Sequence, residues 1–312
     1  MTAGPNERTG ATGAGTGAVF DIGYQRYTGI REGRNRARLA VYKDGVRNAL
    51  GIGRETRTKV LPGLFIALLL VIAMGMAMAA GAAQRLIGPE GPSQLDLPSH
   101  SDYYGIASII IFVFGAVVGP EMLCPDRRNG TINLYLVRPL TGSDYVLARW
   151  AAFVSVMSIV VWLPQLVLLV GLMMGGPDPF QYLSEHWLDL PRLLLSGAAM
   201  AAYTTTLALL TASFTTRRAY ASVFLVGLFV ITTPFTTGLA SEIGGAAGRW
   251  ISMFNLSNIP VHVNDLIFGE VSSVTSVAPA RELSASILIG WYLLWTVVPG
   301  AVLWLRYRRM TP

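Results

Sequence analysis

The sequence predicts an all-α polytopic membrane protein with six transmembrane helices, a basic amphipathic helix before the first span, and a short helix in a cytoplasmic loop. Three observations lead to this prediction. Hydrophobic residues make up 52% of the 312 residues and charged residues only 13%, too few to cover a soluble globule of this length. Six apolar segments each reach the roughly 20 residues that a spanning helix needs. Lys and Arg gather in alternate loops.

The residues before the first apolar segment divide into two parts. Residues 1–19 are mostly Gly, Thr and Ala, a composition with little to bury, so we expect a disordered tail. Residues 20–59 are basic, and apolar residues between Leu39 and Leu50 recur near helical spacing. We expect an amphipathic lead-in helix on the inner membrane surface; the alternative is a solvated basic tail that only fixes topology. The first apolar run follows this long stretch, so no signal peptide is expected.

The remaining chain, residues 60–312, is predicted to form one membrane domain. Its spans are expected at about residues 60–83, 103–122, 149–174, 190–214, 219–239 and 284–305. The loop between the fifth and sixth spans, about residues 240–283, is too long to lack structure. We therefore expect short helices in it that cap or re-enter the membrane.

The polar loop at about residues 122–148 carries several helix punctuation signals. Pro125 is expected to break continuity with the second span, because proline lacks the backbone N–H that a helix needs. Thr131 begins a turn that Pro139 ends, and Thr141 with Asp144 forms a capping pattern for the third span. The loop therefore predicts a short helix parallel to the membrane, with apolar side chains suited to a groove on another protein. The alternative is an ordinary loop whose arginines only fix topology.

The distribution of Lys and Arg predicts the orientation. Twenty of the 24 lie before the first span, in or directly after the loop at 122–148 with Arg149 included, in the loop after the fourth span, or at the C-terminus. By the positive-inside rule both termini are cytoplasmic, in a cytoplasmic (inner) membrane of bacterial type. The net charge of +6 is then explained by topology and by contact with anionic membrane lipid, and no nucleic-acid partner is expected.

Enzymatic and metal chemistry find no support in the sequence. Cys124 is the only cysteine, and the three histidines show no ligand spacing, so we predict no metal site and no catalytic residue. An intramembrane enzyme would need paired acids, a Ser with a His, or a metal motif at membrane depth. A secondary transporter is disfavoured because no strong repeat or midplane charge is present.

One segment resembles a known family. Residues 126–131, Asp-Arg-Arg-Asn-Gly-Thr, are followed by Leu-Tyr-Leu-Val-Arg-Pro-Leu at 134–140 and by Asp-Tyr-Val-Leu-Ala-Arg at 144–149. This pattern resembles the coupling segment of type 2 ABC-exporter permeases, and the six spans, basic lead-in and long outer loop resemble that family's architecture. The chain departs from the pattern at Ile132, where Leu is usual, and at Arg149, where Lys is common.

The resemblance implies a permease subunit that catalyses nothing and binds no cofactor itself. Since the chain has no phosphate-binding Gly-x-x-x-x-Gly-Lys-[Ser/Thr] loop, ATP and Mg would belong to a separate ATPase subunit. A second permease subunit, identical or different, would complete the transporter. The resemblance assigns ATPase docking to Asp126, Arg127, Arg128, Thr131, Leu134, Tyr135 and Arg138.

Two further sets of residues are candidates for roles in transport. Glu121 lies at the inner end of the second span, where burying a carboxylate costs free energy unless it is paired with a cation or hydrated. It therefore either pairs with an arginine of the lead-in helix and transmits motion, or is an interfacial carboxylate exposed to water. By the resemblance, the translocation path is expected at Phe112, Phe114, Thr232, Thr233 and Phe235. A path with aromatics and hydroxyls suits an amphipathic or hydrophobic substrate. A complex that transmits force or regulates another membrane protein, without transport, is the rival within the same architecture.

Overall fold

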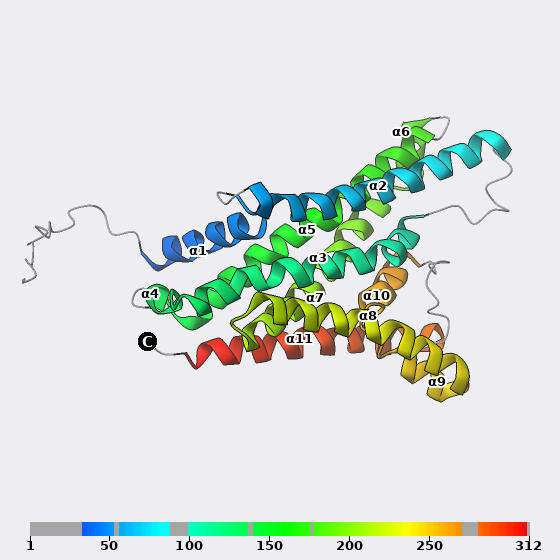
Figure 1. Ribbon diagram of the computed structural model, residues 1–312. Helices are drawn as coiled ribbons and strands as arrows, with labels where there is room; N and C mark the ends of the chain where they lie inside the picture. Colours follow the sequence, from blue (N-terminus) through cyan, green and yellow to red (C-terminus); the bar gives the residue numbers. More distant parts are fainter. Residues whose placement is uncertain are drawn as a thin grey trace, which may run out of the picture. The chain divides into compact units, whose positions relative to one another are not determined.

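The structure is a computed structural model that describes residues 33–52, 56–87, 99–136, 140–175, 178–269 and 280–310. Every regular element in these ranges is a helix, so the predicted all-α class is confirmed (Figure 1). The predicted tail at 1–19 and the first part of the lead-in segment lie outside the described residues. The helices are α1 (Arg34–Ala49), α2 (Thr56–Ile87), α3 (His100–Arg128), α4 (Ile132–Leu136), α5 (Gly142–Gly175), α6 (Pro179–Glu185), α7 (Asp189–Phe214), α8 (Arg218–Ile243), α9 (Gly245–Ser252), α10 (Ile259–Phe268), the 3₁₀ turn η1 (Ala280–Glu282) and α11 (Ala285–Arg308).

Six of these helices are long and apolar enough to cross a membrane, which confirms the six predicted spans. They are α2, α3, α5, α7, α8 and α11. At 1.5 Å per residue, the 34 residues of α5 extend about 51 Å, well beyond the roughly 30 Å of a hydrocarbon core. The chain is therefore a multi-pass membrane protein in which at least one spanning helix continues outside the apolar layer.

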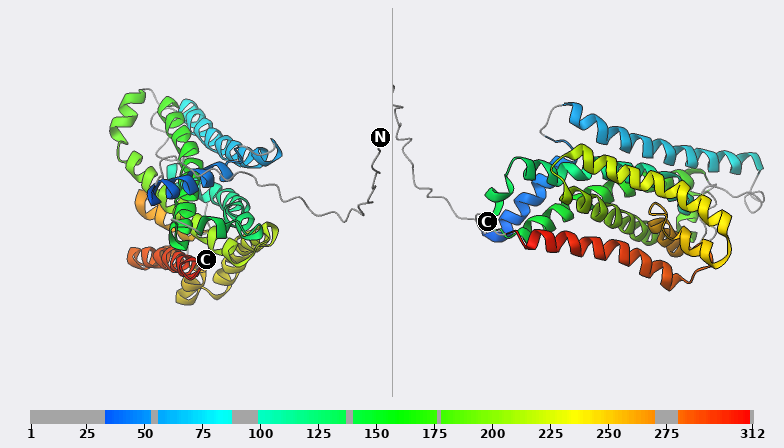
Figure 2. Two further views of the ribbon diagram at one scale, coloured as in Figure 1. Left: turned by 90° about the vertical axis from the view of Figure 1, so that its left-hand side faces the viewer. Right: turned by 60° about the horizontal axis from the view of Figure 1, so that its bottom comes forward.

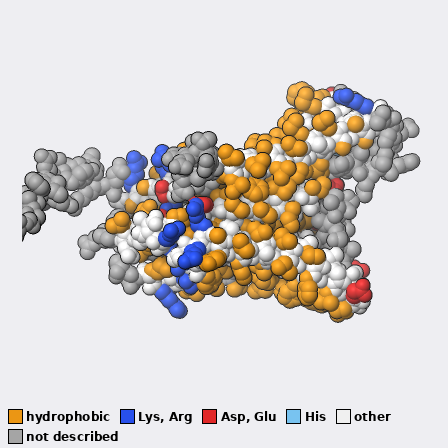
Figure 3. Space-filling view, viewed as in Figure 1, with side chains coloured by type: hydrophobic (Ala, Val, Ile, Leu, Met, Phe, Trp, Pro, Cys, Tyr) orange, Lys and Arg blue, Asp and Glu red, His pale blue; other side chains and the backbone are white. Residues whose placement is uncertain are grey.

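The interior of the bundle is formed by α3, α5 and α7, which are the most buried of the six spans, whereas α2, α8 and α11 expose most of their apolar surface (Figure 2). Hydrophobic side chains cover the middle of the visible face (Figure 3). Close approach of α3 to α7 depends on glycine: a Cβ added at Gly115 would lie 2.4 Å from Thr204 Cγ2, and one at Gly119 would lie 2.6 Å from Ala208 Cβ. Such small residues let membrane helices pack without a hydrophobic driving force.

The predicted break at Pro125 is wrong, because α3 runs through it without interruption and ends only at Arg128. Pro125 leaves one intrahelical hydrogen bond unmade. Burial compensates for this loss, since Leu123 and Cys124, directly before the proline, are fully buried in the core. After the proline, Asn129 N donates to Pro125 O at 2.9 Å, which continues the helical hydrogen bonds. Tertiary packing thus outweighs the tendency of Pro125 to end the helix.

Short helices fill the described part of the loop at 240–283, as expected. These are α9, α10 and η1, and α10 packs against α3, α7 and α11. Several hydrogen bonds hold this region to the bundle; among them, Asn264 Nδ2 donates to Ser101 O at 3.2 Å, and Tyr203 Oη donates to Leu256 O at 2.9 Å. The loop therefore forms a structured cap on the bundle.

Candidate functional site

Basic side chains visible in Figure 3 gather at the end of the bundle that carries α1, α4 and the C-terminal end of α11. This basic end holds the predicted docking residues. It also holds the capping pattern expected at the start of the third span, which is confirmed: Thr141 N donates to Asp144 Oδ2 at 3.0 Å, and Asp144 N donates to Thr141 Oγ1 at 3.3 Å.

The lead-in helix α1 is seated on the protein itself. Its Arg34 donates to Asp144 Oδ2 at 2.7 Å, and its Arg38 donates to Asp144 Oδ1 at 2.5 Å. Its buried face is formed by Val41, Gly45 and Ala49. The predicted lead-in segment is a helix over Arg34–Ala49, and α5 and α3 supply its packing partners, which the sequence did not predict. Its placement on the inner membrane surface stays a prediction.

At the centre of the basic end lies an arginine cluster, formed by Arg149, Asp126, Asp44 and Tyr145. Arg149 is fully buried, and its Nη2 donates to Asp126 Oδ2 at 2.6 Å and to Asp44 Oδ2 at 2.9 Å. Tyr145 Oη donates to the same Asp126 oxygen at 2.7 Å, and the Tyr145 ring lies 5.5 Å from the Arg149 guanidinium carbon. A buried cation is stabilised by its partners, here two carboxylates and an aromatic ring, so the loss of any one of them is expected to destabilise the cluster.

The arginine cluster joins five helices. Asp44 comes from α1, Asp126 from α3, and Arg149 with Tyr145 from α5. The Tyr145 ring also contacts Tyr135 of α4, with centroids 5.6 Å apart, and Tyr307 of α11, with centroids 5.8 Å apart. A displacement of α4 would therefore act directly on the C-terminal end of α3 and the N-terminal end of α5.

Sequence reasoning noted Arg149 only as a departure from the family pattern and as a topological charge. The available signal was an arginine within the helical run of a spanning segment, where an unpaired cation is costly. Its partners are far apart in the sequence, so only the fold shows that Asp44 and Asp126 supply the counter-charge.

Of the residues predicted for docking, several face inward. Asp126 belongs to the arginine cluster, and Thr131 Oγ1 donates to the Asp126 backbone oxygen and to its Oδ1, each at 3.2 Å. Arg127 donates to the backbone oxygens of Ser213 and Thr215 at the end of α7. Tyr135 is half-buried, and burial together with the Asp126 carboxylate raises the pKa of its phenol.

Two of the predicted docking residues, Arg128 and Leu134, face outward. Leu134 on α4 is 75% exposed, although its helix neighbours Ile132 and Leu136 are buried. Arg138 lies outside the described residues. The docking assignment itself stays a prediction, and among the described docking residues only Arg128 and Leu134 are exposed.

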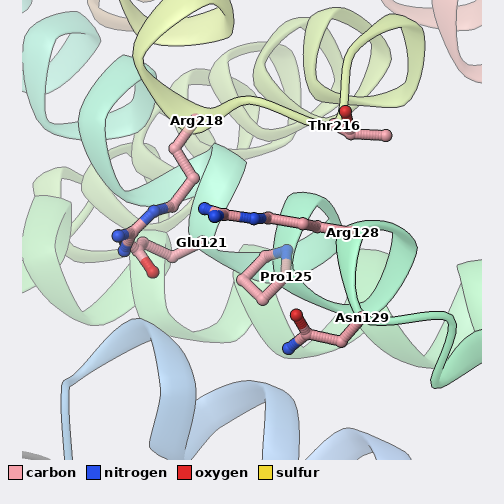
Figure 4. Close-up of a pocket in the computed structure, with 6 residues that line it drawn as sticks. All are labelled: Glu121, Pro125, Arg128, Asn129, Thr216 and Arg218. Carbon is pink, nitrogen blue, oxygen red and sulfur yellow. The ribbon is translucent and has the colours of Figure 1, made fainter.

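A cavity of about 330 Å³ opens beside α3 and the start of α8 (Figure 4). Glu121 pairs there with Arg218 of α8, so its partner in the described structure lies on the fifth span; the lead-in arginines at 54 and 57 lie outside the side chains that the structure describes. The cavity is lined by Glu121, Pro125, Arg128, Asn129, Thr216 and Arg218.

The residues predicted for a translocation path are divided between core and surface. Phe112 is fully buried and stacks on Phe229 with centroids 4.5 Å apart, and Phe114 is buried too. The Thr232 and Thr233 hydroxyls donate to backbone oxygens one turn earlier in α8, Thr232 to Leu228 at 2.7 Å and Thr233 to Phe229 at 3.1 Å.

Phe235 differs from the others because 66% of its side chain is exposed on the outer surface of the bundle. Within one copy of the chain these five residues do not converge on a common channel. Their role in transport stays a prediction.

No protein-family model matches the chain, and no curated protein matches it. Within the described ranges, no group of three His, Cys, Asp or Glu side chains is arranged to hold a metal ion. At the basic end, ion pairs and packed aromatic rings join neighbouring helices to one another.

Proposed function

We propose that this chain is the permease subunit of an ATP-driven ABC exporter, placed in a cytoplasmic membrane with both termini inside, and that α4 receives the motion of a separate ATPase subunit. One observation carries the proposal. The five-residue helix α4 stands outside the six spans, presents Leu134 outward, and is anchored inward through Tyr135 to the arginine cluster. A short external helix tied to the ends of spanning helices suits the transfer of force.

The transfer would run through contacts between side chains. A push on α4 reaches Tyr145 through the Tyr135 ring, and Thr131 carries it to Asp126 through hydrogen bonds at 3.2 Å. Asp126 and Arg149 then move α3 and α5 together, because their ion pair at 2.6 Å joins the two helices. Packed interiors transmit such shifts because they are dense and deform little.

The resemblance of residues 126–149 to the coupling segment of type 2 ABC-exporter permeases supports the same function. The ATPase, with its ATP and Mg, and a second permease subunit are therefore the proposed partners. The exposed apolar surface of α2, α8 and α11 is available to lipid or to that second subunit. The proposed substrate class is amphipathic or hydrophobic.

A Leu134→Glu variant is expected to weaken retention of the ATPase by about tenfold, since a carboxylate would replace an apolar contact at the interface. The measurement is vanadate-sensitive ATP hydrolysis that co-purifies with the tagged chain from native membranes. Phe180→Glu is the matched control, because Phe180 is an even more exposed apolar side chain, on α6 at the opposite end of the bundle.

Equal recovery of ATPase activity with both variants would remove α4 as the docking helix. Loss with Leu134→Glu alone, at unchanged yield of folded chain, is the supporting result. Absence of any co-purifying ATP hydrolysis from the wild-type chain, after crosslinking as well, would contradict the function itself.

A second candidate function is force transmission without transport. The stacked rings of Phe112 and Phe229, with Tyr203 against Phe112 at 6.1 Å, fill the space between α3, α7 and α8 in a single copy. A complex with a filled interior would hydrolyse ATP without stimulation by lipids or amphipathic compounds. Stimulation by such compounds favours the exporter.

A further inference from the structure

The cavity between α3 and the start of α8 carries a net positive charge. Two of the side chains that line it are arginines, Arg128 and Arg218, and one is acidic, Glu121, which pairs with Arg218. Arg128 is exposed, and no hydrogen bond or ion pair joins it to another described residue. Among the described residues, Arg128 therefore adds one positive charge to the lining beyond the Glu121–Arg218 pair.

The geometry brings hydrogen-bond donors together around this charge. In Figure 4 the Arg128 guanidinium points across the cavity toward the Glu121–Arg218 pair, while Asn129 and Thr216 add an amide and a hydroxyl at its edges. The cavity also lies at the N-terminal end of α8, whose first N–H groups have no side-chain cap. An uncapped helix N-terminus carries a partial positive charge that favours anions.

The position relative to the apolar surface selects the kind of anion. Aromatic side chains close in sequence to the lining residues Thr216 and Arg218 are exposed on the outer surface, with Phe214 58%, Tyr220 62% and Phe224 62% exposed. Phe224 lies on the spanning helix α8, six positions after Arg218. The cavity lies at the start of this exposed apolar span, and the end of a span is where lipid headgroups meet a membrane protein.

We propose that this cavity binds a phosphate-bearing anion, with the headgroup phosphate of an anionic phospholipid as the preferred source. Arg128 would donate two parallel hydrogen bonds to the phosphate oxygens, and Arg218 would share its charge between the phosphate and Glu121. The volume of about 330 Å³ is at the lower end of the range for small-ligand sites, which fits a headgroup without its acyl chains. The acyl chains would run along the exposed apolar surface of α8.

The test uses the full chain purified alone in nonionic detergent, so that its outcome does not depend on the proposed ATPase. Phosphatidylglycerol is titrated in, and native mass spectrometry measures the fraction of chain that carries one lipid. We expect binding to be tighter than that of phosphatidylcholine, and Arg128→Gln to weaken it by about tenfold, since a hydrogen bond to a charged group is lost. Because Arg128 is exposed, this substitution is expected to leave the fold intact.

Two further variants make the result specific. Arg309→Gln removes an exposed arginine at the same end that does not line the cavity, so it is expected to change the affinity less than about twofold. Glu121→Gln removes the one acidic side chain of the lining and is expected to tighten binding, a gain that damage to the fold would not produce. Equal affinity of wild type and Arg128→Gln, or equal losses at Arg128 and Arg309, would overturn the proposal.

The source of the phosphate is decided by competition. If inorganic phosphate displaces phosphatidylglycerol at low millimolar concentration, the site is a free-phosphate site of the same chemistry. If inorganic phosphate fails to compete while Arg128→Gln still loses the lipid, the acyl chains contribute and the source is the membrane. Because lipid binding is measured on the chain purified without the ATPase, its outcome supports or overturns the anion site independently of the proposed function.

Discussion

Replacement of Arg149 by leucine is expected to lower the free energy of unfolding by about 3 kcal/mol or more, because it leaves the poorly hydrated Asp126 carboxylate without its cation. Arg149 is fully buried, and Asp126, its partner at 2.6 Å, keeps only 16% of its side chain exposed. The measurement is thermal or denaturant unfolding of the purified chain in detergent, followed by tryptophan fluorescence.

The matched control is Arg309→Leu, which removes an exposed arginine at the same end of the bundle and is expected to change stability by less than about 0.5 kcal/mol. A double variant, Arg149→Leu with Asp126→Leu, is expected to be more stable than Arg149→Leu alone, since a buried ion pair replaced by apolar residues costs less than a broken one. If Arg149→Leu unfolds like Arg309→Leu, the arginine cluster does not hold the basic end together.

The sequence alone was sufficient for the parts of this fold that depend on local composition. Each span is a continuous apolar run, and its length is a physical requirement of the bilayer, so six runs predicted six spanning helices correctly. The Thr141–Asp144 cap was predictable for the same reason, because both members of the cap lie within four residues. The short helix α4 was also predictable, because Thr131 before it can begin a helical turn and Pro139 after it ends one.

The direction in which a polar side chain points was not predictable in this way. Asp126 and Arg127 lie in a charged, loop-like sequence, and both were assigned to an outer surface. In the structure Asp126 pairs with Arg149, and Arg127 binds the last carbonyl groups of α7. Those partners lie on other helices, so their positions depend on the packing of the whole bundle.

The continuation of α3 through Pro125 has a similar explanation. The loss of one hydrogen bond is a local cost that the sequence displays, whereas the burial of Leu123 and Cys124 against neighbouring helices is a gain that it does not display. The same holds for α1: its spacing predicted a helix, but the carboxylate of Asp144 that binds Arg34 and Arg38 lies on the third span.

Gly45→Val is expected to release α1 from its seat on α5, and this is the second large effect predicted from the structure. A Cβ at Gly45 would lie 2.7 Å from Ala152 Cβ and 3.1 Å from Met122 Cε, and an added isopropyl group needs still more room. Overpacking of a close helix contact costs about 1–3 kcal/mol. The neighbouring Asp44, which pairs with Arg149 at 2.9 Å, would move away with the helix.

The measurement is limited trypsin cleavage after Arg38 and Arg47 under native conditions, because a helix that leaves its seat exposes its backbone to the protease. Cleavage is expected to be roughly tenfold faster in Gly45→Val, in line with the 1–3 kcal/mol cost. Lys43→Val is the matched control, since it adds the same side chain to the exposed face of α1. Helix propensity alone would favour the helix in Gly45→Val and disfavour it in Lys43→Val, so faster cleavage in Gly45→Val is due to the contact with Ala152 and not to propensity. Equally slow cleavage in both variants would mean that α1 tolerates the added volume without leaving α5, and that its arginines on Asp144 are sufficient to hold it.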